Sequence, residues 1–166
     1  MAITTLNNRS INRSDTASAD QVWTATSATA SDFQAVSGGK VLQVVGATDS
    51  TARSHTSASY VTGSNTLTVD ITPSATSSKI FVLISTLVVG TVNSYFTIYR
   101  DATNLGTATG MTKASGDNQE SMCITILDSP SSTSQITYQL YSKQDSGTTY
   151  IGGGATGTII AMEIGA

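Results

Sequence analysis

The chain has little charge of either sign, and this scarcity restricts what it can bind. Of 166 residues, 8 are Lys or Arg and 11 are Asp or Glu, which gives 11% charged residues and a net charge of −3. Nucleic-acid binding requires clustered basic side chains, and the sequence contains no such cluster. We therefore expect no nucleic-acid partner.

Long apolar runs and cysteine pairs are also missing. No run approaches the roughly 18 apolar residues of a membrane-spanning helix, and Met1–Leu6 lacks the charged start and apolar core of a signal peptide. Cys123 is the single cysteine, so no intramolecular disulfide can form. We expect no membrane insertion, and folding in the cytoplasm of the cell that makes the protein.

Proline is almost absent, and its two positions are informative. Pro73 lies in Ile71–Ile80 and Pro130 lies in Ser129–Ile136, each within a polar segment of small hydroxyl residues between two strand-like runs. Proline fixes φ and cannot donate to a β-ladder, so it belongs at a corner rather than in a central strand. Two matching corners indicate a sandwich folded from two similar halves.

Apolar residues gather into strand-like runs, and no convincing amphipathic helix is present. Residues 66–71 alternate with period two, which places Leu67, Val69 and Ile71 on one face. The long apolar run Lys79–Val89 is typical of a central strand covered on both sides. Cys123, between Met122 and Ile124, is expected to be a buried, inert thiol. The predicted strands cover residues 40–45, 66–71, 79–89, 95–99, 121–127, 135–141, 148–151 and 158–164.

Spacings of about 8–15 residues between these runs predict an all-β fold, an antiparallel β-sandwich of jelly-roll type, for residues 38–166. Residues 1–37 differ, because they carry few large apolar side chains. A flexible terminus is one interpretation. The favoured one is an extended N-terminal arm that orders on a partner. Its candidate docking residues are Ile3, Leu6, Arg9, Ile11, Arg13, Trp23 and Phe33.

Residue types suited to catalysis or metal binding are scarce. His55 lies in the loop-like segment Arg53–Ser57 and is expected to be an exposed loop residue, and no Gly-x-Ser-x-Gly segment is present. One His and one Cys cannot form a usual zinc site. Asp117, Glu120 and Asp128 lie close in sequence but match no calcium-loop pattern. Paired carboxylates for glycoside cleavage have no specific support. We predict no catalytic residues, no metal and no cofactor.

Tyrosine is the one aromatic residue present in some number. A tyrosine contributes a large amphipathic area at low entropic cost, which suits recognition surfaces and interfaces. Core and cross-strand packing is the alternative for most of them. The candidates for a surface or interface are Tyr95, Tyr99, Tyr141 and Tyr150.

Several segments together resemble a domain of tailed-bacteriophage virion surface proteins, particularly those of marine phages. The order and spacing of these segments carry the resemblance, which spans most of residues 20–164. The matching pieces are Gly39–Val45, Thr68–Ser74, Thr76–Ile84, Leu127–Ser131 and Ile160–Ile164, and Asp20–Thr26 to Phe33–Val36 resembles the connector that often introduces this domain in tail-fibre proteins.

The resemblance implies a non-enzymatic module on the virion surface, a homotrimer attached to phage capsid or tail proteins. In this interpretation residues 1–37 fix the protein to the particle and the sandwich projects outward. A head decoration or short head appendage is favoured, because 37 residues are short for a fibre shaft and its docking region. The alternative is a tail-fibre or receptor-binding protein that recognises a glycan or receptor on the host surface. An enzyme or an unrelated lectin-like domain is the least supported interpretation.

Overall fold

The computed structural model describes residues 21–25, 31–35 and 39–165, the first two ranges by their backbone alone. These residues form thirteen strands and no helix. Contacts between residues divide the chain into two compact units, Met1–Gly38 and Gly39–Ala166. The described part of the first unit is a two-stranded antiparallel sheet of β1 (Gln21–Ala25) and β2 (Ser31–Ala35).

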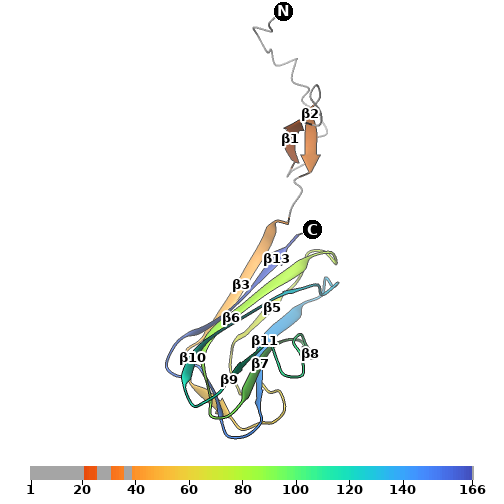
Figure 1. The fold of residues 1–166 in the computed structure, drawn as a ribbon. Coiled ribbons are helices and arrows are strands. Elements are labelled where there is room, and N and C mark those ends of the chain that lie inside the picture. The colour runs from red at the N-terminus through yellow and green to blue at the C-terminus, as the bar shows by residue number, and fades with distance from the viewer. Residues whose placement is uncertain (1–20, 26–30, 36–38, 166) are drawn as a thin grey trace, which may run out of the picture. The chain divides into compact units, whose positions relative to one another are not determined.

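The second unit is an antiparallel β-sandwich of two sheets (Figure 1). The six-stranded sheet contains β3 (Val41–Asp49), β4 (Arg53–His55), β6 (Lys79–Gly90), β10 (Gln119–Asp128), β12 (Thr149–Ile151) and β13 (Gly157–Ile164). The five-stranded sheet contains β5 (Thr68–Ile71), β7 (Ser94–Arg100), β8 (Thr103–Asn104), β9 (Thr112–Ala114) and β11 (Ile136–Gln144). The all-β, antiparallel prediction is confirmed.

The strand order is that of a jelly roll. In the six-stranded sheet β3 pairs with β13, β13 with β6 and β6 with β10, while in the other sheet β5 pairs with β11 and β11 with β7. The chain passes from one sheet to the other at nearly every connection between long strands. Strands that are neighbours in a sheet are therefore distant in sequence, which is the double Greek-key arrangement of a jelly roll.

Both prolines lie at corners between strands, as predicted. The corner with Pro73 leads from β5 in the five-stranded sheet to β6 in the six-stranded sheet, and the corner with Pro130 leads from β10 back to β11. Neither proline interrupts a ladder. The two corners therefore carry the chain between the layers in opposite directions.

Apolar side chains of both sheets meet in one core. Period-two alternation puts every second residue of β6 and β11 inward, so that Ile80, Val82 and Ile84 pack opposite Tyr138 and Leu140. All five of these side chains are fully buried. The burial of such side chains contributes about 1.5–3 kcal/mol each to stability.

The prediction that β6 is covered on both faces is wrong. Its inward residues are buried, but Phe81, Leu83, Leu87 and Val89 on the other side remain partly exposed, because no second layer covers that side within the described chain. The apolar run is continuous because both faces of the strand are apolar. Only one of these faces belongs to the core.

Two carboxylates, the fully buried Glu163 and the partly buried Asp128, tie the two proline corners to the sheets. Glu163 of β13 is fully buried and accepts hydrogen bonds from the Ser74 amide (2.7 Å), the Ser74 hydroxyl (2.6 Å), the Ser78 hydroxyl (2.7 Å) and Gln43 Nε2 (2.6 Å). Burial raises the pKa of Glu163, but these hydrogen bonds outweigh it and bring the pKa to about 2. The carboxylate is therefore ionised and holds the Pro73 corner.

Asp128 holds the second corner as Glu163 holds the first, and it lies two residues before Pro130. Its oxygens accept two hydrogen bonds from Arg100 Nη1, at 3.0 and 2.8 Å, and one from the Tyr138 hydroxyl at 2.6 Å. Burial, together with this bond to Asp128, raises the pKa of Tyr138 far above its usual value. The group joins β7, β10 and β11 where the chain changes sheets.

Candidate functional site: the tyrosine face

Three of the four tyrosines proposed from the sequence come together on the outward side of the five-stranded sheet. Tyr95 and Tyr99 lie on the same face of β7. Tyr141 lies in β11, which pairs with β7, and is on the same side of the sheet. The neighbouring ring of Tyr60 and the side chain of Lys143 complete the group. We call the surface formed by these five residues the tyrosine face.

The rings of the tyrosine face hold one another in place. Tyr99 and Tyr141 stack with centroids 4.0 Å apart and planes 21° apart, and Tyr60 meets Tyr99 at 6.0 Å and 56°. The Lys143 ammonium lies 5.0 Å from the Tyr60 centroid and 5.5 Å from that of Tyr95, within cation–π range. All five side chains are partly exposed. The face is therefore a preformed amphipathic surface.

Hydrogen bonds fix the edge of the tyrosine face. The Tyr95 hydroxyl and Asn93 Nδ2 each donate to Asp145 Oδ2 at 3.0 Å. The hydrogen bond to Asp145 raises the pKa of Tyr95, and the same bonds hold the pKa of Asp145 below its usual value. Burial raises the pKa values of Tyr60 and Tyr99. The phenols of Tyr60, Tyr95 and Tyr99 are neutral and the Asp145 carboxylate is ionised at neutral pH, so the face suits binding rather than proton transfer.

The other predicted site residues do not join this face. Tyr150 lies in β12 on the six-stranded sheet and is 41% exposed. Trp23 and Phe33 are directly opposite each other in the pairing of β1 with β2. The remaining candidate arm residues, Ile3, Leu6, Arg9, Ile11 and Arg13, lie outside the described residues. The docking role of the arm stays a prediction.

Tyr60, Lys143 and Asp145 were missed as members of the site. Tyr60 lies in the irregular segment between β4 and β5, where no strand pattern gives its direction. Lys143 lies two residues beyond the predicted strand 135–141, and the observed β11 extends to Gln144, which gives Lys143 the same parity as Tyr141.

His55 differs from its prediction as an exposed loop residue. It lies in β4, paired with Thr149 of β12, and is half-buried. Its Nδ1 accepts a hydrogen bond from the Ser57 amide at 3.2 Å, so the ring proton is on Nε2, which donates to Ser142 Oγ at 2.7 Å. Burial lowers the pKa of His55 and keeps it neutral. A base for Ser142 would need a free lone pair on Nε2, so this pair is structural.

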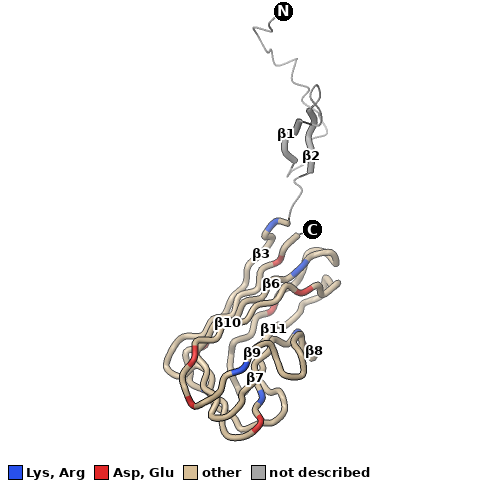
Figure 2. The backbone as a smooth tube through the Cα atoms, in the orientation of Figure 1, with Lys and Arg blue, Asp and Glu red and all other residues tan. Residues whose placement is uncertain are grey.

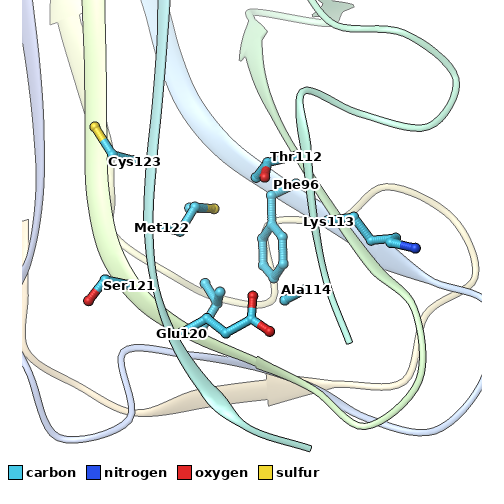
Figure 3. A pocket seen from close by; sticks show the side chains of 9 residues that line it. Phe96, Thr112, Lys113, Ala114, Glu120, Ser121, Met122 and Cys123 are labelled. Atoms are coloured by element: carbon cyan, nitrogen blue, oxygen red, sulfur yellow. The ribbon is translucent and has the colours of Figure 1, made fainter. Parts of the chain in front are cut away.

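Cys123 is exposed, contrary to its prediction as a buried thiol. Met122 and Ile124 point into the core, and the residue between them must point out. Figure 3 shows Met122 and Glu120 directed toward Phe96, whereas Ser121 and Cys123 point the other way.

The crevice in Figure 3 is too small for a ligand site. It lies between β9 and β10, where the edges of the two sheets face each other, and has a volume of about 160 Å³. Pockets for organic ligands usually enclose about 300–1,000 Å³. Glu120 lines the crevice, whereas Asp128 is bound to Arg100. Among the described residues no group of three or more His, Cys, Asp or Glu side chains is arranged to hold a metal ion.

Comparison with known proteins gives no family. No family model matches the chain, and no curated protein matches it. The described residues contain no helix that is long and apolar enough to cross a membrane.

Solved structures of the VP2 protein of infectious bursal disease virus are similar to this chain. VP2 in a mutant form in derived T=1 particles is 13% identical with a TM-score of 0.35, and VP2 in a subviral particle is 14% identical with a TM-score of 0.33. The matches cover 84% and 85% of this chain but 40% and 43% of the VP2 chains, so the chain spans about two fifths of their length. Such low TM-scores carry no argument about function.

Proposed function

We propose that this chain is a non-enzymatic structural protein displayed on the surface of a bacteriophage particle, as a head decoration or a short head appendage. The observation that carries the proposal is the division of the chain into a short N-terminal unit and a separate β-sandwich. This arrangement suits an attachment segment followed by a displayed domain. That the particle is a bacteriophage is taken from the resemblance of residues 20–164 to surface domains of phage virions.

The chemistry of the sandwich supports a structural role. Three of its buried or partly buried ionisable groups have fixed structural partners: Glu163 holds the Pro73 corner, Asp128 holds Arg100, and His55 donates to Ser142. Jelly rolls are common among viral capsid and lectin domains, although a fold alone does not determine a function.

The proposal is tested by asking whether the protein is present on particles and accessible there. Phage particles banded on a density gradient are digested with a protease that removes a tag placed after Ala166. We expect the protein to band with particles and the tag to be removed without loss of the particles. Absence of the protein from the banded particles would refute the proposal, and a tag that is cut only after particle disruption would refute surface display.

The tyrosine face favours a second candidate, a tail-fibre or receptor-binding protein. Preformed tyrosine surfaces recognise partners at low entropic cost. Under this alternative, Tyr141→Ala removes a stacked ring and reduces adsorption of phage to host cells at least tenfold. Thr133→Ala, an exposed change in the corner between β10 and β11, is the control. Equal adsorption by both variants would exclude the alternative.

A further inference from the structure

The outward side of the six-stranded sheet is an apolar surface that nothing in the described chain covers. Its exposed members include Val44 (56% exposed), Leu127 (53%), Leu42 (48%) and Tyr150 (41%). Leu83 of β6 and Ile160 of β13 lie opposite each other between them and are partly exposed. We call the surface marked by these six residues the apolar face.

Strand register makes the apolar face continuous. Val44 of β3 is opposite Met162 of β13, Met162 is opposite Phe81 of β6, and Phe81 is opposite Leu127 of β10. One row of side chains across four strands is therefore entirely apolar. Cross-strand neighbours on the same face are about 4.5–5.5 Å apart between their Cβ atoms, so these side chains form one patch rather than isolated contacts.

Charge is excluded from the apolar face. Every charged residue in the strands of the six-stranded sheet is within the first two or the last two positions of its strand, and the middle of the sheet in Figure 2 is uncharged. Only Lys79, the first residue of β6, is charged and has outward parity. The tyrosine face of the same molecule, in contrast, carries Lys143 and adjoins Asp145. An ordinary solvated face on this protein thus has charged groups, and the apolar face does not.

The size of the apolar face matches a specific interface. Four strands at a spacing of about 4.8 Å give a width of about 19 Å, and an average of about 10 residues per strand gives a length of about 33 Å at about 3.3 Å per residue. The projected area of this side of the sheet, including its exposed hydroxyl residues Thr48, Ser85 and Thr125, is therefore about 600 Å² per copy. Stable protein interfaces bury about 600–1,000 Å² on each partner.

We propose that the apolar face binds the apolar face of a second copy of this chain. A partner must offer an uncharged apolar surface of similar extent, because a charged surface would lose its hydration without gaining an opposite charge. The same chain carries such a surface and is always present at equal concentration. A symmetric contact also closes on itself. This inference does not depend on the proposed function, since it concerns the purified protein and not its place on a particle.

The first test is the mass of the full-length purified chain in solution at about 50 µM, measured by light scattering. We expect a dimer, because a two-fold contact between identical faces closes with two copies. The homotrimer that the resemblance implies would contradict the proposal. Val44→Asp puts a charge into the apolar row and is expected to weaken self-association at least tenfold. Val92→Asp is the matched control, because Val92 is also exposed (42%) but lies in the turn between β6 and β7, outside the apolar face.

The second test uses Cys123, the only cysteine of the chain, which is opposite Ser85 on the same side of the sheet as Leu83. Maleimide labelling of this thiol is expected to be at least tenfold slower in the wild-type oligomer than in Val44→Asp. Circular dichroism of both variants shows whether they are folded. A folded Val44→Asp monomer with a fast-reacting thiol supports the proposal.

Four other results would overturn it. A monomeric wild type with a reactive thiol means that the face is open or is covered by another protein. A monomeric wild type with a protected thiol means that residues of the chain's own N-terminal unit cover it. An oligomer whose thiol is unprotected associates through another surface. The same conclusion follows if Val92→Asp dissociates the oligomer as well as Val44→Asp does.

Discussion

At the scale of single residues, the buried charges of this protein stabilise corners of the fold. Glu163 is fully buried and accepts more hydrogen bonds than any other carboxylate in the described chain. The donors belong to Ser74, Ser78 and Gln43. A buried charge without such partners would cost several kcal/mol. Glu163 therefore fixes the Pro73 corner against β13 and β3, and its removal should affect folding rather than binding.

Substitution Glu163→Gln is expected to lower the free energy of unfolding by about 1–3 kcal/mol at pH 7, because hydrogen bonds to a charged acceptor are lost and an amide group faces the Ser74 amide. Urea denaturation measures the change. Glu120→Gln, on an exposed residue of β10, is the control and is expected to change stability by less than about 0.5 kcal/mol. Equal effects of the two substitutions would contradict the structural role of Glu163.

The same carboxylate predicts a pH dependence. The pKa of Glu163 is about 2 in the folded protein, below its ordinary value of 4.5, so its ionised form stabilises the fold above about pH 4.5. This stabilisation is lost as the pH falls from about 4.5 toward 2. The stability difference between wild type and Glu163→Gln should thus be constant from pH 7 to pH 5 and smaller at pH 3. A difference that is unchanged at pH 3 would argue against the lowered pKa.

At the scale of elements, alternation and proline position predicted most of the jelly roll. Residues 66–71 are predicted as a strand because alternating apolar residues mark one face, and the observed β5 agrees with them. Residues 158–164 are predicted as the closing strand from their apolar residues, and the observed β13 covers them. The corners were recognised because proline cannot lie in a central ladder. These signals are local, so the sequence alone was sufficient for them.

The sequence was not sufficient where a strand or its buried face depends on pairing with residues that are distant in sequence. Arg53–His55 has no strand pattern, and β4 exists because its backbone pairs with β12, far away in the sequence. Likewise, β6 is apolar at both parities, so its pattern does not show which face meets the other sheet. Cys123 was assigned to the core for the same reason, although its parity is opposite to that of Met122.

The connection between β12 and β13 also depends on a contact that is distant in sequence. Gly152 has φ of +96°, and a Cβ there would lie 2.8 Å from the Thr51 carbonyl oxygen, whereas Gly154 has φ of +91° and open space around it. Both alanine substitutions carry the cost of a positive φ. Gly152→Ala should therefore be less stable than Gly154→Ala by at least about 1 kcal/mol. Thermal unfolding of the two variants measures this difference, and equal stabilities would contradict the close approach to Thr51.

At the scale of the whole molecule, the sandwich presents two outer faces of different chemistry. The tyrosine face is rigid, amphipathic and bordered by charge, whereas the apolar face is uncharged and large enough for a protein interface. A displayed module needs a surface for assembly and a surface that stays in solvent. Under the proposals made above, the apolar face serves self-association and the tyrosine face stays in solvent.

The most direct test of this account is electron microscopy of intact particles that carry a gold-labelled tag after Ala166. The account predicts label distributed over the head, as expected for a decoration or a short head appendage. Label confined to the tail would contradict the head assignment and support the receptor-binding alternative. Particles without any label, from a lysate in which the tagged protein is expressed, would contradict the central claim that this chain is a virion surface protein.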